Sequence, residues 1–165
     1  MPEIILLLHN IRSTHNVGSI FRTAEGFGVN KIILSGYTPY PTVPHDKRLP
    51  HIREKLTNQI HKTALGAEQM VPFEYIEQPN LLALKQAGYH IVALEQSPNS
   101  TVLRDYNAPE KLVLVLGEEV HGIPVETLNQ CDDILEIPMH GKKESFNVSV
   151  AAAIALYELS KNGQN

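Results

Sequence analysis

The sequence has little of what marks several common protein classes. It contains one cysteine, Cys131, in 165 residues, which excludes an internal disulfide framework and fits a reducing compartment. We interpret Cys131 as a small buried apolar side chain, not a nucleophile. No apolar run approaches the roughly 20 residues that a membrane-spanning helix needs. The start, Met1-Pro2-Glu3, lacks the basic region of a secretory signal, so we expect a cytoplasmic protein with no membrane partner.

Motifs for metal, nucleophilic and phosphate-loop chemistry are also missing. The eight histidines form no H-x-x-x-H pair and no cluster with the cysteine, so no metal is expected. There is no G-x-S-x-G nucleophile elbow. Neither the G-x-G-x-x-G dinucleotide fingerprint nor a P-loop is present.

The sequence has no excess of positive charge either. The 18 acidic residues outnumber the 14 lysines and arginines, for a formal net charge of −4. Domains that hold nucleic acid by charge alone are usually basic. Any nucleic-acid site must therefore be a local patch, or be assembled by pairing two chains.

What the sequence does contain is a series of short apolar strands that alternate with helices. The length and the 42% hydrophobic content fit one domain over residues 1–165. Strands are predicted at residues 4–8, 31–34, 71–76, 90–94, 112–116 and 134–137. Helices are predicted at 16–27, 52–65, 81–87, 125–130 and 146–160, with a proline-rich loop over 36–50. This alternation predicts an α/β domain with a mainly parallel sheet flanked by helices.

Three polar segments each follow a predicted strand: residues 16–22, 117–122 and 137–149. In parallel sheets, ligands bind beyond the carboxyl ends of the strands. We therefore predict that the three segments form one site. Taken singly, they have plainer interpretations as a capped surface helix, a strand-to-helix turn and a capped core helix.

The two helices in these segments have predicted caps and a predicted role. Asn16 is expected to be the N-cap of the first helix, and Arg22 adds donors that suit a phosphate. Ser145 is expected to be the N-cap of the last helix. Because that helix is apolar on nearly every side, we expect part of it to lie in a subunit interface.

Together the three segments resemble the SpoU (TrmH-type) branch of the SPOUT methyltransferases. The resemblance is carried by Asn16-x-Gly18-x-x-x-Arg22, Gly117-x-Glu119-x-x-Gly122, Ile137-Pro138-Met139 and Ser145-x-Asn147-x-Ser149, with support from residues 62–67. It implies a SPOUT-type fold with a deep C-terminal trefoil knot, and a homodimer. It also implies an S-adenosylmethionine-dependent enzyme that methylates a ribose 2′-hydroxyl of tRNA or rRNA.

The resemblance also implies roles for particular residues. The functional polar residues carry over to Asn16, Arg22, Glu119, Ser145 and Asn147. The residues expected to bind the methyl donor are Leu94, Glu95, Leu116, Gly117, Gly122, Ile137, Met139 and Ser145. We expect RNA to contact the basic residues Arg12, Lys47, Arg48, Arg53, Lys55, Lys62, Lys142 and Lys143.

Arginine stays protonated in proteins and is therefore a poor base. In this hypothesis Arg22 instead binds a phosphate and stabilises the developing oxyanion. The other four polar residues orient the arginine, the loop and the ribose. Three alternatives stay open: methylation of an RNA base by the same fold, a non-catalytic RNA-binding module, and a small-molecule-binding α/β domain.

Overall fold

The strands carry apolar side chains on both faces, and this pattern builds a parallel sheet that is covered on two sides. The computed structural model of the protein describes residues 1–161. The strands are β1 (Glu3–His9), β2 (Lys31–Ser35), β3 (Phe73–Tyr75), β4 (His90–Leu94), β5 (Thr101–Val102), β6 (Lys111–Leu116) and β7 (Asp133–Glu136). The α-helices are α1 (Thr14–Gly26), α2 (Pro50–Ala64), α3 (Leu81–Gln86), α4 (Val125–Leu128) and α5 (Val148–Ser160). Two short 3-10 helices are η1 (Ala67–Gln69) and η2 (Leu103–Asp105).

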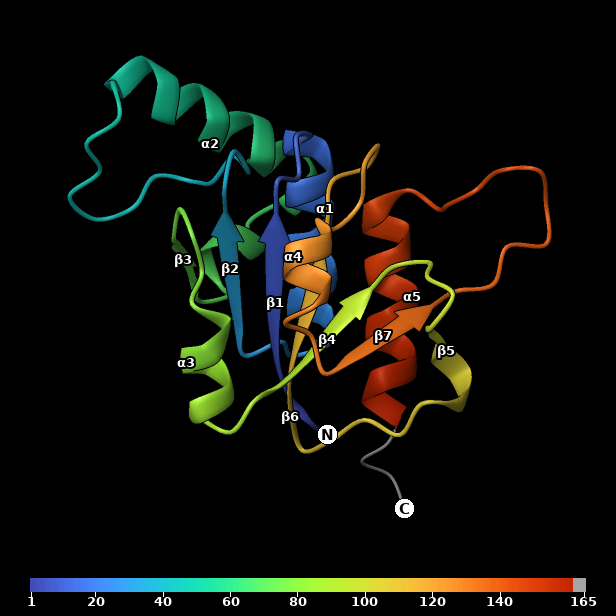
Figure 1. The fold of residues 1–165 in the computed structure, drawn as a ribbon. Helices are drawn as coiled ribbons and strands as arrows, with labels where there is room; N and C mark the ends of the chain where they lie inside the picture. Colours follow the sequence, from blue (N-terminus) through green and yellow to red (C-terminus); the bar gives the residue numbers. More distant parts are fainter. Residues whose placement is uncertain (162–165) are drawn as a thin grey trace.

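All seven strands belong to one sheet, in the order β3-β2-β1-β6-β4-β7-β5. Every pairing is parallel, and Leu6 of β1 stands beside Leu114 of β6 near the middle of the sheet. The prediction of a mainly parallel sheet is confirmed. Because the strands run the same way, their carboxyl ends all meet at one edge (Figure 1).

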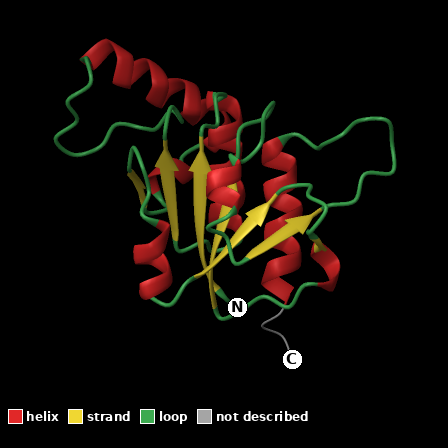
Figure 2. Cartoon of the chain, in the orientation of Figure 1, coloured by secondary structure: helices red, strands yellow, loops and turns green. Residues whose placement is uncertain are grey.

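Alternate residues of each strand enter different hydrophobic cores, as the two-residue period of a strand requires. Ile4, Leu6 and Leu8 pack with α1, α2 and α5, whereas Ile5 and Leu7 pack on the side of α3 and α4. Figure 2 shows α3 and α4 in front of the sheet, with α1 and α5 behind it. The two helical layers hold the sheet edge in a fixed position.

The element predictions agree with the structure except at a few points. The predicted strands and helices are all present, with ends that differ by at most two residues. The two-residue strand β5 and both 3-10 helices were not predicted, because they are too short to show a period. Within residues 1–161, no helix combines the length and the apolar character that crossing a membrane requires.

The packing of α1 against α2 depends on Gly18. A Cβ atom at this position would overlap Thr63 Oγ1 and the backbone carbonyl oxygen of Ile60, and it would lie 3.0 Å from the backbone nitrogen of Ala64. Backbone atoms of a neighbouring helix cannot swing aside as a flexible side chain can. The glycine in the first motif therefore has a packing role that is separate from any chemistry.

We expect Gly18→Ala to lower the free energy of unfolding by about 1–3 kcal/mol, because overpacking at a helix contact forces the backbones apart. Urea unfolding followed by circular dichroism would measure the change. Gly26→Ala, in the same helix, is the matched control, since a Cβ there meets nothing within 4 Å. Equal destabilisation by both substitutions would contradict this account.

Candidate functional site

The three segments predicted to share a site do lie along one edge of the sheet. Residues 10–13 leave β1, residues 117–124 leave β6 and residues 137–147 leave β7, all at carboxyl ends of parallel strands. β1 is adjacent to β6, and β4 lies between β6 and β7. The segment after β7 projects from the body of the molecule before it enters α5 (Figure 1).

A chain of hydrogen bonds joins one residue from each segment. Asn147 Nδ2 donates to Asn16 Oδ1 at 3.1 Å, and Asn16 Nδ2 donates to Glu119 Oε1 at 3.1 Å. The other carboxylate oxygen of Glu119 accepts from the backbone N–H of Arg12 at 3.4 Å. Both ends of the Asn16 carboxamide are thus held, and the structure confirms that these three segments meet.

The caps of the two helices differ from the prediction. Ser13, not Asn16, caps α1: its Oγ accepts from the backbone N–H of Asn16 at 3.2 Å. Asn147, not Ser145, caps α5 and accepts from Ser149 N at 2.9 Å. The expected caps were wrong because several polar residues precede each helix, and either serine or asparagine can cap. With Ser13 as the cap, the side chain of Asn16 is left to bridge Glu119 and Asn147.

A cavity of about 430 Å³ opens beside this hydrogen-bonded chain, within the size range of small-molecule sites. The segments after β4, β6 and β7 and the first turn of α5 form its walls. All eight residues predicted to bind the methyl donor line it, namely Leu94, Glu95, Leu116, Gly117, Gly122, Ile137, Met139 and Ser145. Residues that line it but were not predicted include Gln96, Ile123, Leu128 and Phe146. Gln96, Ile123 and Phe146 each directly follow a predicted residue in the sequence, which was the available signal, whereas Leu128 does not adjoin one.

The wall of the cavity is shaped by two glycines and a glutamate. Glu95 Oε2 accepts from Ile123 N at 3.0 Å, and Glu95 Oε1 accepts from Gln96 N at 2.9 Å. Gly122 has a φ of 70°, and a Cβ atom there would overlap Glu95 Oε2. A Cβ atom on Gly117 would lie 2.5 Å from Ile123 Cγ1. Glu95 therefore clamps the 117–123 turn against the end of β4.

The charge of the cavity has one sign. Five carboxylates line it, and no lysine or arginine does among the described residues; the five are Glu95, Glu118, Glu119, Glu136 and Glu144. Such a wall repels phosphate and favours a cationic or neutral ligand. The cavity is therefore suited to a small molecule that carries positive charge, not to an RNA backbone.

Two of the five polar residues predicted to be catalytic stand apart from the hydrogen-bonded chain. Ser145 is exposed on the cavity wall. Arg22 is exposed on α1 and does not line the cavity. Within residues 1–161 its side chain makes no hydrogen bond or ion pair. A single chain thus brings together Asn16, Glu119 and Asn147, but not Arg22.

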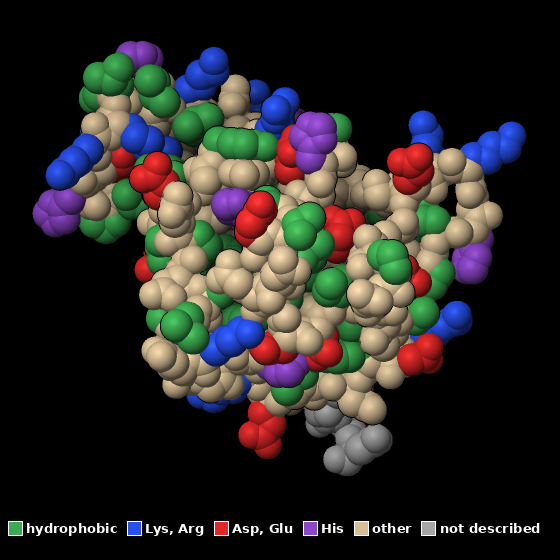
Figure 3. Space-filling view, in the orientation of Figure 1, with side chains coloured by type: hydrophobic (Ala, Val, Ile, Leu, Met, Phe, Trp, Pro, Cys, Tyr) green, Lys and Arg blue, Asp and Glu red, His purple; other side chains and the backbone are tan. Residues whose placement is uncertain are grey.

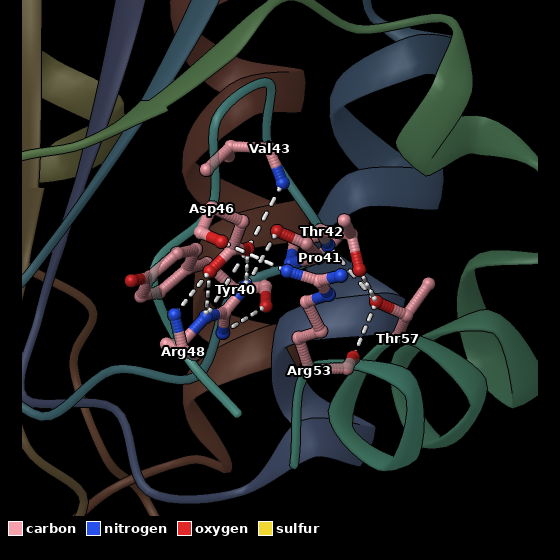
Figure 4. A network of polar contacts seen from close by, with 8 residues as sticks. All are labelled: Tyr40, Pro41, Thr42, Val43, Asp46, Arg48, Arg53 and Thr57. Carbon is pink, nitrogen blue, oxygen red and sulfur yellow. Dashed lines mark hydrogen bonds and ion pairs between the residues drawn. The ribbon is translucent and has the colours of Figure 1, made fainter. Parts of the chain in front are cut away.

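Two of the basic residues expected to contact RNA, Arg48 and Arg53, also make hydrogen bonds within the chain. Arg48 Nη2 pairs with Asp46 Oδ2 at 2.6 Å, and its Nη1 donates to the carbonyl oxygen of Tyr40 at 2.9 Å (Figure 4). Its guanidinium lies 3.6 Å from the centre of the Tyr40 ring. Arg53 Nη1 donates to the carbonyl oxygen of Asp46 at 2.8 Å. Most of the Arg48 donors are thus used inside the 40–48 loop, and its assignment as an RNA contact stays a prediction.

The same network lowers the pKa of the Asp46 carboxyl. The Arg48 guanidinium holds the pKa of the Asp46 carboxyl well below its ordinary value, so the pair stays ionised at neutral pH. The remaining predicted RNA contacts are exposed: Arg12, Lys47, Lys55, Lys62, Lys142 and Lys143.

The cysteine and the histidines do not form a reactive centre. Cys131 is half-buried and its Sγ lies 3.3 Å from the carbonyl oxygen of Thr127. Burial raises the pKa of the Cys131 thiol to about 11, so it is protonated at neutral pH. Among residues 1–161, no group of three or more His, Cys, Asp or Glu side chains is arranged to hold a metal ion.

Comparison with known proteins identifies relatives over nearly the whole chain. Residues 3–157 match the sequence profile of the SpoU rRNA Methylase family. The 23S rRNA (guanosine-2'-O-)-methyltransferase RlmB of Coxiella burnetii is 32% identical over 97% of this chain and 59% of its own length. The chain therefore spans little more than half the length of this curated relative.

Solved structures share the fold. The TrmH/SpoU tRNA modifying enzyme of A. aeolicus superposes with a TM-score of 0.80 at 27% identity, over 98% of this chain and 76% of that one. The AdoMet-bound rRNA methyltransferase from Sinorhizobium meliloti superposes with a TM-score of 0.78 at 25% identity, over 96% of this chain and 56% of that one.

We expect Gly122→Ala to lower the free energy of unfolding by roughly 1–3 kcal/mol, since it combines a left-handed backbone with a displaced Glu95 carboxylate. Urea unfolding would measure it. Gly141→Ala is the control, because that glycine lies in a nearby loop, has no positive φ and leaves open space around an added Cβ. If Gly122→Ala is as stable as Gly141→Ala, Glu95 does not clamp the turn.

Proposed function

This chain belongs to the SpoU rRNA Methylase family, and we propose that it transfers a methyl group from S-adenosylmethionine to a ribose 2′-hydroxyl of tRNA or rRNA. The names of the relatives support this: one is a guanosine-2'-O-methyltransferase of 23S rRNA, and another structure is of an AdoMet-bound enzyme. The observation that carries the proposal is the Asn147–Asn16–Glu119 chain at the side of an acidic cavity.

The size and the charge of the cavity suit S-adenosylmethionine. When bound, this donor supplies a methyl group already activated on a positively charged sulfonium. Carboxylates around the cavity favour that charge over the neutral sulfur left after transfer. The apolar side chains of Leu94, Leu116, Ile137 and Met139 provide a surface for an adenine ring. We therefore assign the eight cavity residues of the sequence prediction to donor binding.

The polar chain would position the ribose beside the donor. Asn16 is held from both sides, so its carboxamide loses little freedom when a substrate arrives. Glu119 is fixed by Asn16 and by the backbone of Arg12. Asn16 and Glu119 would align the ribose hydroxyl with the donor. Arg22 would supply charge-assisted hydrogen-bond donors to a phosphate and to the developing oxyanion.

Arg22 does not line the cavity of its own chain, and we propose a homodimer in which it reaches the cavity of a second subunit. Three large apolar side chains at the surface of α5 are exposed: Phe146 at 41%, Val150 at 46% and Tyr157 at 55%. The Tyr157 ring meets Phe27 just beyond α1, with ring centres 6.4 Å apart. Pairing two such surfaces would bury them, and we propose that Arg22 of each subunit then faces the cavity of its partner.

The resemblance to the family also implies a deep trefoil knot near the C-terminus, and we include it in the proposal. The fold that the chain shares with the TrmH/SpoU tRNA modifying enzyme, with a TM-score of 0.80 over 98% of this chain, supports it.

Methylation itself is tested with labelled donor. We expect the protein to transfer labelled methyl groups from S-adenosylmethionine to unmodified tRNA or rRNA. The label should appear in alkali-resistant dinucleotides, because a methylated 2′-oxygen cannot attack the adjacent phosphodiester. Label in mononucleotides would instead indicate a methylated base. Donor binding without any transfer would indicate a non-catalytic module.

The role of Arg22 is tested by mixing subunits. We expect Arg22→Ala to reduce methyl transfer about a hundredfold or more while donor binding, measured by calorimetry, is retained. Asn16→Ala should also be inactive. If Arg22 acts on the partner's cavity, co-expression of the two variants restores one site in each mixed dimer, or roughly a quarter of wild-type activity. Mixed dimers as inactive as either parent would place Arg22 and Asn16 in the same subunit's site.

A further inference from the structure

A second cleft lies on the other side of Arg12 from the donor cavity. It runs between the start of α1, residues 36–40 and one side of α2, and encloses about 520 Å³. We call it the α1–α2 cleft; its lining includes Arg12, Ser13, Tyr37, Tyr40, Leu56 and Gln59. The roles proposed so far do not use Tyr37, although two of the predicted RNA contacts, Arg12 and Arg48, line this cleft.

Tyr37 is exposed, yet its backbone is held firmly. The side chain is 50% exposed, whereas the backbone N–H donates to Asn10 Oδ1 at 3.1 Å. On one side, the carbonyl oxygen of Gly36 accepts from the Tyr75 hydroxyl at 2.6 Å. On the other, Thr38 is buried. Because the loop is ordered before any ligand binds, a ring that stacks on Tyr37 would meet a prepared surface.

Thr38 ties this loop to β1. Its Oγ1 accepts from the backbone N–H of Ile11 at 3.0 Å and donates to the carbonyl oxygen of Leu8 at 3.1 Å. The loop that carries Tyr37 is therefore anchored to the same strand end from which Arg12 leaves.

Arg12 connects the cleft to the donor cavity. Its guanidinium carbon lies 5.7 Å from the centre of the Tyr37 ring, and its side chain is 71% exposed. Its Nε lies 3.9 Å from a carboxylate oxygen of Glu118, and its backbone N–H reaches Glu119. Both glutamates line the donor cavity. A group in the cleft would thus lie next to a group held at the cavity mouth.

The donor cavity and the α1–α2 cleft differ in the sign of the charges around them. The donor cavity carries five carboxylates, whereas exposed basic side chains lie on and near α2, the wall of the cleft; they include Lys47, Lys55 and Lys62. Figure 3 shows Lys and Arg side chains gathered over the α2 end of the molecule. A polyanion is therefore directed to the α1–α2 cleft and away from the cavity.

We propose that the α1–α2 cleft binds an unpaired nucleotide next to the methylated one, with its base stacked on Tyr37 and its phosphate near Arg12. This rests on the proposed function, because it assumes an RNA substrate. An aromatic ring beside an arginine is the arrangement that proteins use to hold unstacked bases without reading their sequence. The target nucleotide would accordingly lie in a loop or another single-stranded region.

The absence of tryptophan makes a direct test practicable. Tyr37→Trp keeps an aromatic surface and places the only indole of the protein in the cleft. We expect its fluorescence to fall when a 12-nucleotide single-stranded RNA is added, and to stay unchanged with an abasic chain of the same length. Leu82→Trp on α3 is the control, since Leu82 is 62% exposed and lies outside both hollows, and its fluorescence should not respond.

Binding of the same labelled RNA, followed by fluorescence anisotropy, gives the energetic test. We expect Tyr37→Ala to bind on the order of tenfold more weakly, because it removes the ring on which one base stacks. Tyr37→Phe should keep most of the affinity, because its ring can still stack on that base. Arg12→Ala should make binding less dependent on salt, since one phosphate contact is removed.

The outcomes separate this inference from the proposed function. If the wild type binds and methylates RNA, but the Tyr37→Trp signal is flat and Tyr37→Ala binds normally, the stacking site is wrong and the methyltransferase proposal stands. If the wild type neither binds nor methylates any RNA, both proposals fail. Quenching by the abasic chain would show that the backbone, not a base, occupies the cleft, and would overturn the stacking arrangement.

Discussion

The parallel pairing of β1 with β6 at the centre of the sheet is the constraint on which the rest of the structure depends. Because both strands are buried on both faces, they cannot slip or turn over without exposing apolar side chains. Their carboxyl ends are therefore fixed side by side. This is why Asn16 and Glu119, 103 residues apart in sequence, come within hydrogen-bonding distance, and why Asn147 can reach Asn16 from the N-cap of α5.

Around that edge, acidic and basic side chains occupy different places, which reconciles the net charge of −4 with the proposed RNA substrate. Five of the 18 acidic residues line one cavity, the proposed site of the cationic donor. Basic side chains lie over α2 and on the loop before α5. The average charge of a chain thus says little about its partners when opposite charges occupy different hollows, because screening limits each charge to its own neighbourhood.

Positions that look alike in sequence turn out to act differently in the structure. Gly18 belongs to the same motif as Asn16 and Arg22, but it is required by the contact of α1 with α2. Arg48 resembles an RNA contact, yet it holds the 40–48 loop together through Asp46 and Tyr40. Tyr37 is a single exposed aromatic in the sequence, and only the structure places its ring beside Arg12. Residue type and spacing cannot separate these roles, because each depends on partners far along the chain.

The sequence by itself determined the parallel α/β sheet, nearly all of its elements and the edge at which the three polar segments meet. Strand and helix periods are local, and parallel strands place their ends together whatever the details of packing. Only the tertiary structure decided which residue caps each helix, that Asn16 bridges Glu119 and Asn147, that Arg48 is used internally, and that Arg22 stands away from its own cavity. These depend on distances between segments a hundred residues apart, which side-chain packing sets and local sequence does not contain.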